Sequence, residues 1–195
     1  MARWSQVLML PSMARSLRPT SRAARVPARC AASSLDEQIA RGAPGAVERR
    51  LAELGYELPP VGTPKGSYGL TSRMGDTLYV CGHLPIPPSG ELIVGRVGAD
   101  LDADAAKDAA FWCGMNILAT LREVVGFENV VQVHKLVGFV NCVDGFEAQP
   151  TVINGCSDLL YEVLGDKGRH ARSAVGVNVL PLGVPVEIEA VVEVH

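Results

Sequence analysis

The sequence is poor in several features that mark large classes of protein. Aromatic residues make up 5% of its 195 positions, and the formal net charge is −3. Neither a base-stacking platform nor a basic face for nucleic acid is therefore indicated. No stretch approaches the roughly 18 uninterrupted apolar residues of a membrane-spanning helix. These shortages predict a protein with no nucleic-acid partner and no membrane span.

Cysteine and histidine are also few, and their spacing matches no known site pattern. The 5 cysteines contain no C-x-x-C pair, and their odd number gives no sign of a disulfide framework. The 4 histidines form neither an H-x-x-x-H nor an H-E-x-x-H motif. We therefore expect reduced thiols and no metal site. The cysteines are Cys30, Cys81, Cys113, Cys142 and Cys156.

Acidic residues and lysine are missing from the beginning of the chain. Residues 1–34 contain six arginines among frequent serine and alanine, and the first acidic residue is Asp36. This composition is typical of an organelle transit peptide. Residues 26–32 resemble the processing sites of chloroplast precursors, so we expect a chloroplast protein, with the mitochondrion as the alternative. A disordered tail that is never removed is the other interpretation.

The rest of the sequence predicts one α+β domain behind a helical extension. Residues 35–61 have helical spacing up to Gly55, with an interruption at 42–45, and then a proline-rich connector. From residue 62 on, strand and helix patterns follow the order β-β-α-β-α-β-β, which predicts two helices against one mixed sheet. The expected strands are 68–73, 77–81, 130–140, 173–180 and 186–194, and the expected helices are 103–125 and 152–164.

Arg172 is an unusual charge to find at the start of an apolar strand. Its guanidinium stays protonated at any working pH and can bind a carboxylate through two hydrogen bonds. Because Ala174 and Val175 beside it are small and apolar, we expect its charged end to point into a cleft. Two interpretations stay open: an ion pair with Glu187 or Glu189, or a receptor for a small acid.

Two short patterns add candidate chemistry. Glu187 and Glu189 share one side of the last strand by period-two alternation, so they form either a general base with its orienting group or a solvated face. Cys81 precedes His83 by two residues, which permits thiol activation, although a buried structural thiol is the favoured interpretation. Gly82 between them lets a ligand oxygen approach the backbone N–H closely.

Two further side chains are placed by their neighbours. Residues 62–69 are glycine-rich but lack the phosphate-binding pattern and lead into a strand, so we interpret them as a loop that delivers Tyr68. His170 precedes Arg172 by two residues. It either lies at the mouth of the same cleft or is an ordinary surface histidine, and the surface histidine is the favoured interpretation.

Three motifs together resemble a known family. They are TLYVCGHLP at 77–85, ARSA at 171–174 and VEIEA at 186–190. They are similar to the signatures of the RidA/YjgF family of reactive-intermediate imine deaminases, also called the endoribonuclease L-PSP family. The resemblance covers residues 62–195, and GRHARSAVG at 168–176 is similar to one subgroup. Cys81 stands where the family usually has Ser, and His83 stands where it usually has Gln.

The resemblance implies a fold, an assembly and a reaction. The fold would be chorismate-mutase-like, in a homotrimer whose three sheets form a barrel, with substrate clefts between subunits. The reaction would be hydrolysis of 2-imino or enamine acids, such as 2-aminoacrylate or 2-iminobutanoate, to 2-keto acids and ammonia, without a cofactor. A non-catalytic trimer that binds a small carboxylate or docks on a partner is the alternative. A ribonuclease or translation inhibitor is disfavoured by the acidic balance.

The resemblance also implies roles for individual residues. Arg172 would grip the substrate carboxylate, and Glu187 would position or activate the attacking water. The remaining residues would contact the substrate in the cleft: Tyr68, Cys81, Gly82 and Ala174.

Overall fold

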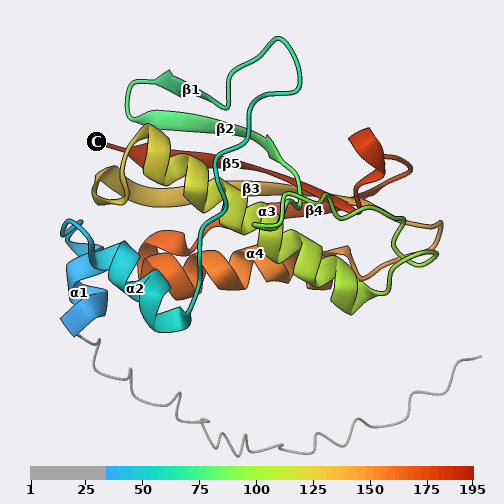
Figure 1. The fold of residues 1–195 in the computed structure, drawn as a ribbon, viewed down its shortest axis with the longest axis horizontal. Coiled ribbons are helices and arrows are strands. Elements are labelled where there is room, and N and C mark those ends of the chain that lie inside the picture. Colours follow the sequence, from blue (N-terminus) through green and yellow to red (C-terminus); the bar gives the residue numbers. More distant parts are fainter. Residues whose placement is uncertain (1–33) are drawn as a thin grey trace, which may run out of the picture. The chain divides into compact units, whose positions relative to one another are not determined.

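Helices and strands follow one another in the expected order, after two short N-terminal helices (Figure 1). The computed structural model describes residues 34–195, so the expected transit peptide lies outside the described residues, apart from Ser34. The helices are α1 (Ser34–Ala40), α2 (Ala46–Leu54), α3 (Ala103–Val124) and α4 (Gln149–Leu164). The strands are β1 (Thr71–Met74), β2 (Thr77–His83), β3 (Val130–Asn141), β4 (Ala171–Val177) and β5 (Val186–Val194). Three 3₁₀ turns complete the structure: η1 (Phe127–Asn129), η2 (Gly165–Gly168) and η3 (Pro181–Gly183).

The five strands form one sheet in the order β1-β2-β5-β3-β4. All neighbouring strands are antiparallel except β3 and β4, which are parallel. A parallel pair needs a long crossover, and α4 supplies it between β3 and β4. The expected α+β architecture with a mixed sheet is confirmed, and β1 and β4 are the two edges.

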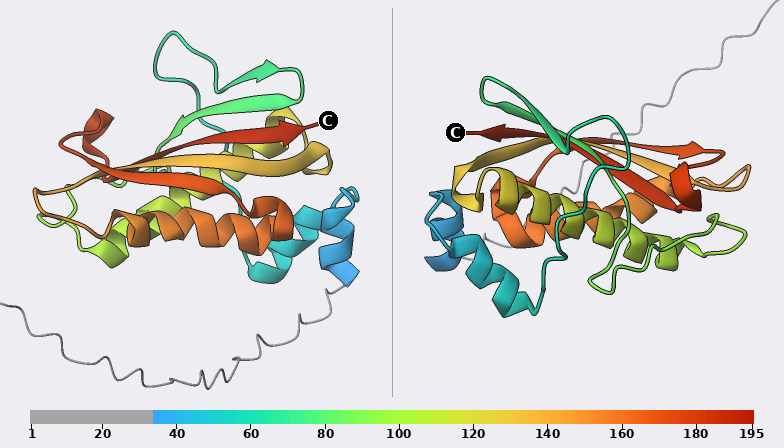
Figure 2. Two further views of the ribbon diagram at one scale, coloured as in Figure 1. Left: turned by 180° about the vertical axis from the view of Figure 1, so that it is seen from behind. Right: turned by 45° about the horizontal axis from the view of Figure 1, so that its top comes forward.

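One face of the sheet is covered by α3 and α4, as the views from both sides show (Figure 2). Side chains that alternate along the central strands, such as Leu136, Val140, Ile188 and Val192, are fully buried on this face. The intervening residues point the other way and are half-buried or exposed. Among residues 34–195, no helix covers that second face.

Several element boundaries differ from the expectation, among them the end of β2 at His83 rather than at 81 and the start of α4 at Gln149 rather than at 152. The first strand begins at Thr71 rather than at 68, because a tight turn with a bond from Tyr68 N to Gly66 O comes before it. Tyr68 therefore lies in the preceding loop. The fourth strand begins at Ala171 and ends at Val177, so Arg172 is its second residue. The chain then turns through η3, where Leu182 has a φ of 58°.

The N-terminal extension packs on its own domain. Gly42–Gly45 separates α1 from α2, as the interruption in the helical spacing predicts. Leu35, Ile39, Val47 and Leu51 belong to the same buried cluster as the sheet and the two long helices. An ion pair between Arg50 and Asp36 joins the two short helices.

The α3–α4 contact depends on glycines that leave no space for a side chain. A Cβ atom at Gly155 in α4 would lie 2.0 Å from the Lys107 carbonyl oxygen of α3. A Cβ atom at Gly114 would lie 3.0 Å from Leu159 Cδ2, and one at Gly138 in β3 would lie 2.5 Å from Ile153 Cδ1. The two helices therefore lie close to each other, and α4 lies close to the sheet.

We expect Gly155→Ala to lower the free energy of unfolding, measured by urea denaturation, by about 2 kcal/mol, because an added methyl overpacks a contact between backbones. The higher helix propensity of alanine acts in the opposite direction, by up to about 1 kcal/mol. Gly62→Ala is the control, since a Cβ atom there meets nothing within 4 Å. A Gly155→Ala protein as stable as the native chain would contradict this packing.

Candidate functional site

Three of the expected substrate contacts line one cavity. Tyr68 comes from the loop before β1, while Cys81 and Gly82 come from the end of β2. The cavity measures about 110 Å³ and has mixed polar and apolar walls. Its other lining residues include Thr63, Pro64, Lys65, Leu70, His83, Leu84, Ile86, Asn116 and Thr120.

A bulge in β2 shapes the floor of this cavity. The pairing with β5 shifts between Val80 and His83, so the ladder is interrupted at Cys81 and Gly82. His83 Nδ1 lies 2.7 Å from the Cys81 carbonyl oxygen, and its Nε2 lies 2.7 Å from Thr120 Oγ1. A carbonyl only accepts, so Nδ1 carries the proton, and in the neutral ring, which burial favours, Nε2 is the acceptor to which Thr120 donates. The imidazole thus ties the bulge to α3 in its neutral form.

Burial supports this assignment, because it lowers the pKa of His83 below its usual value of 6.5. Asn116, one turn before Thr120 on α3, donates to the Ile86 carbonyl at 2.9 Å and fixes the next part of the wall. The sequence-based prediction missed both α3 residues. Their signal was two polar residues four apart on an otherwise apolar helix face.

Glu187 of β5 lies against the bulge. A Cβ atom at Gly82 would be 1.9 Å from Glu187 Oε1, so a side chain at this position would displace the carboxylate. Burial raises the pKa of Glu187, and the nearby Glu189 raises it further. No cation lies within ion-pair distance of Glu187 among residues 34–195. The carboxylate is therefore held beside the Gly82 backbone with its charge uncompensated.

Cys81 is half-buried rather than fully buried, and both ring nitrogens of the neighbouring His83 are engaged in other contacts. Burial raises the pKa of its thiol, and the negative charge of Glu187 raises it further. His83 is already bonded to the Cys81 carbonyl and to Thr120. The structure therefore favours a protonated contact residue over a nucleophile.

Arg172 lies elsewhere, on β4. Its Nη1 donates to Ser157 Oγ at 3.0 Å, and its Nη2 donates to the Pro150 carbonyl at 2.9 Å. No carboxylate of the described chain lies within 4.0 Å of its guanidinium. The ion pair with Glu187 or Glu189 is therefore wrong for the chain by itself.

His170 is half-buried rather than at the surface, and it belongs to the surroundings of Arg172. Its Nε2 lies 3.0 Å from Ser157 Oγ, and its Nδ1 lies 2.7 Å from the Gly168 carbonyl oxygen. Burial lowers the pKa of His170, and the positive charge of Arg172 lowers it further. Ser157, which the sequence-based prediction missed, connects the two side chains. Apart from its place on a predicted helix, nothing in the sequence marked Ser157 as a site residue.

Within one chain, Arg172 and Glu187 are kept apart by strand order and by side-chain alternation. Arg172 pairs with Leu136, whose buried side chain faces the helices, whereas Glu187 pairs with Phe139 and points to the uncovered face. Strand β3 lies between β5 and β4, which separates the strands of Glu187 and Arg172 by roughly 10 Å, and β2, which carries Gly82, is roughly 14 Å from β4. Ala174 lies with Arg172 on β4, half-buried. The predicted site residues thus form two separate groups.

The described residues contain no cluster of three or more His, Cys, Asp or Glu side chains that could hold a metal ion. Within the same residues, no helix has both the length and the apolarity needed to cross a membrane.

We expect His83→Gln to reduce the loss of stability at acidic pH. The unfolded chain protonates this histidine near pH 6.5, whereas the folded chain keeps it neutral to lower pH. Its contribution to stability is therefore present above pH 6.5 and is lost as the pH falls toward the folded-state pKa. Urea denaturation between pH 7 and pH 5 should show a slope smaller by up to about 1.4 kcal/mol per pH unit. His195→Asn, at the exposed C-terminus, should leave the slope unchanged, and a native-like slope in His83→Gln would contradict the neutral assignment.

Comparison with known proteins gives relatives that match this chain over most of their own length. Protein TCP17 of Trypanosoma cruzi is 38% identical over 155 residues, which are 78% of this chain and 97% of the relative. The crystal structure of Atu1372 from Agrobacterium tumefaciens superimposes with a TM-score of 0.72 at 40% identity, covering 82% of this chain and 96% of that one.

RidA from an Antarctic Psychrobacter superimposes less closely, with a TM-score of 0.51 at 25% identity, over 69% of this chain and 94% of that one. The family model described as "YjgF/chorismate mutase-like, putative endoribonuclease" matches residues 48–192. That match spans both groups of site residues, and the chain belongs to the RidA/YjgF family.

Proposed function

We propose that this protein hydrolyses small 2-imino or enamine acids to 2-keto acids and ammonia, in clefts between the subunits of a homotrimer. The observation that carries the proposal is the environment of Arg172. Its guanidinium donates only to uncharged oxygens in the described chain, those of Ser157 and Pro150. A half-buried cation without a carboxylate partner favours binding of an anion from outside the chain.

The second group of residues suits the chemical step. In the proposed reaction, the guanidinium of Arg172 binds the carboxylate of the protonated imine. Glu187 takes a proton from a water molecule whose oxygen attacks C2. Glu187 returns this proton to the nitrogen of the resulting carbinolamine. The C–N bond then breaks, the hydroxyl proton passes to the departing ammonia, and ammonium and the 2-keto acid leave with Glu187 ionised again. The raised pKa of Glu187 brings it nearer to that of an effective general base.

An enamine substrate needs one earlier step. Protonation at C3 converts the enamine into the imine, after which hydrolysis proceeds in the same way. The half-buried carboxyl of Glu187 and the thiol of Cys81, both beside Gly82, are the groups that we propose as the source of this proton. The step consumes one proton and needs neither an oxidant nor a metal ion.

The position of the two groups supports the trimer. Arg172 is on the edge strand β4, whereas Glu187 is on the central strand β5 and lies beside Gly82 of β2 on the uncovered face. A neighbouring copy in a ring could therefore bring its own Arg172 edge to this group. The uncovered sheet face also carries apolar side chains, since Tyr79 is 45% exposed and Val175 is 44% exposed. Burial of this face in a central barrel would remove that apolar area from water.

Two other functions are the alternatives to this proposal. An endoribonuclease agrees with the family description, but the net charge of −3 gives no basic surface for RNA. A trimer that only binds a small carboxylate would use the same Arg172 without turnover. Kinetics separate this alternative from the proposed enzyme.

We expect Arg172→Ala and Glu187→Gln each to lower the hydrolysis rate by about a hundredfold or more. The substrate is 2-aminoacrylate, released from serine by a dehydratase, and the readout is semicarbazide-trappable imine. Mixed trimers refolded from equal amounts of the two variants should recover about a quarter of the native rate, because random mixing gives that share of clefts both native residues.

The matched controls are Arg122→Ala and Glu123→Gln, two exposed positions at the end of α3. Both should keep the native rate. No acceleration by the native protein would refute the enzyme in favour of a binding protein. Two inactive variants that stay inactive after mixing would refute the shared cleft.

A further inference from the structure

Hydrogen bonds connect the Arg172 guanidinium through Ser157 to His170. We infer that His170, acting through Ser157, is a positioning residue that fixes the orientation of Arg172 for carboxylate binding. The inference rests on the proposed role of Arg172 and adds two residues, one from the segment before β4 and one from α4.

The direction of each hydrogen bond follows from donor and acceptor chemistry. The Gly168 carbonyl only accepts, so His170 Nδ1 carries the proton, and in the neutral ring Nε2 is the acceptor. Ser157 must then donate its hydroxyl proton to Nε2 at 3.0 Å. Its remaining lone pairs face Arg172 Nη1, which donates to Oγ at 3.0 Å. The serine hydroxyl is therefore held in the one orientation that accepts from Arg172.

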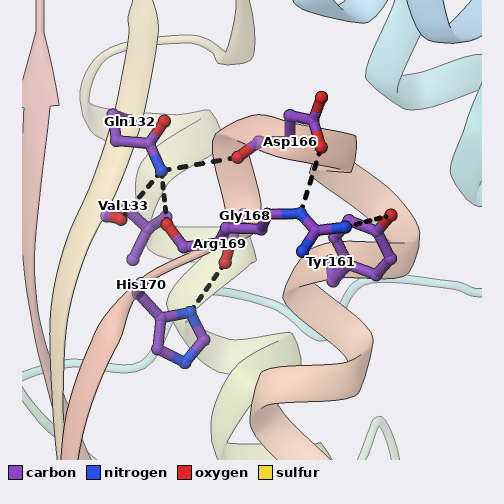
Figure 3. A network of polar contacts seen from close by, with 7 residues as sticks. All are labelled: Gln132, Val133, Tyr161, Asp166, Gly168, Arg169 and His170. Atoms are coloured by element: carbon purple, nitrogen blue, oxygen red, sulfur yellow. Dashed lines mark hydrogen bonds and ion pairs between the residues drawn. The ribbon is translucent and has the colours of Figure 1, made fainter. Parts of the chain in front are cut away.

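The start of this relay is itself fixed. Figure 3 shows the turn that carries Gly168 and His170, with Gln132 of β3 reaching across to it. The Gln132 amide donates to the carbonyls of Val133, at 3.1 Å, and of Arg169. A Cβ atom at Gly168 would lie 2.1 Å from the Leu160 carbonyl oxygen, so this turn is pressed against α4.

The charged side chain of Arg169, next to His170, bonds to other residues and takes no part in the relay. Arg169 donates to Asp166 at 3.1 Å and to the Tyr161 hydroxyl at 2.8 Å, and its guanidinium lies 4.4 Å from the centre of the Tyr161 ring (Figure 3). Arg172 is the charged group that acts on His170 from β4. The guanidinium of Arg172 is thus held at two nitrogens, by Ser157 and by the Pro150 carbonyl.

This arrangement has a functional consequence. Arginine has several rotatable bonds, and ordering such a side chain on binding a ligand costs free energy. Hydrogen bonds to two of its nitrogens order the guanidinium in advance and leave its other N–H groups for the ligand. Loss of the relay should weaken carboxylate binding without removing the charge.

The test measures binding of 2-oxobutanoate, a stable 2-keto acid, to the 195-residue chain by isothermal titration calorimetry. Ser157→Ala and His170→Asn should each raise Kd by about tenfold, the ratio that corresponds to one ordinary hydrogen bond. Because both act in one relay, the double variant should be no weaker than either single variant. Additive losses would overturn the relay.

Conservative variants separate positioning from folding. Ser157→Thr keeps the hydroxyl, and His170→Gln keeps an acceptor near the position of Nε2, so both should bind within about twofold of the native chain. Ser89→Ala and His195→Asn are matched controls at exposed positions. The ¹⁵N spectrum of the native imidazole should show His170 protonated at Nδ1, and a proton on Nε2 of the neutral ring would overturn the inference.

The outcomes for the inference and for the proposed function are distinct. Arg172→Ala should abolish binding of 2-oxobutanoate. Failure of the native chain to bind, or equal binding by Arg172→Ala, would refute the carboxylate role of Arg172 and with it the relay. Binding that depends on Arg172 but is unchanged in Ser157→Ala and His170→Asn would refute the relay alone.

Discussion

The close packing of α3 and α4 on one face of the sheet is the constraint on which the rest of the structure depends. Gly155 allows the backbone of α4 to approach that of α3, and Gly138 allows α4 to approach β3. With both helices on that side, the alternate residues of the central strands are buried there, and Glu187 is directed to the opposite face. The same packing brings Ser157 of α4 to the β4 edge, where Arg172 meets it. The two groups of site residues, one around Arg172 and one around Gly82 and Glu187, are two half-sites, and the positions of both follow from this helix packing.

Each half-site is electrostatically incomplete in the described chain. Arg172 is a half-buried cation whose bonding partners are neutral, and Glu187 is a half-buried carboxylate whose pKa is raised by burial. Partial burial of a charge that has no ion-pair partner costs free energy, and no ion pair within one chain offsets that cost. In the proposed trimer, a substrate with one carboxylate and one protonated imine nitrogen would compensate both charges at once. This complementarity explains why the two residues stand on different faces of the sheet, where they form no direct ion pair within the chain.

Much of the fold could be predicted from the sequence, because apolar periodicity reports local structure directly. The helix that ends at Val124 and the strand of Val186–Val194 were predicted to within one residue. The strand order could not be predicted, since periodicity does not say which strands are neighbours, and so the separation of Arg172 from Glu187 was missed. The bulge at Gly82 also breaks the alternation from which the relation of Cys81 to its neighbours was predicted. Ser157 was missed because a serine on an amphipathic helix has no distinctive sequence signal.

The relay of His170 and Ser157 matters because of the kind of reaction proposed. Hydrolysis of an imine needs no metal ion and no covalent intermediate, so most of the acceleration must come from holding water, acid and substrate in the right geometry. A small displacement of the carboxylate receptor would then cost as much as the loss of a functional group. On the Gly82 side, His83 and Thr120 hold the bulge against α3 in the same way that His170 and Ser157 hold Arg172. In both half-sites a neutral histidine accepts one hydrogen bond from a hydroxyl and donates one to a backbone carbonyl. The fold itself therefore fixes the orientation of the site residues.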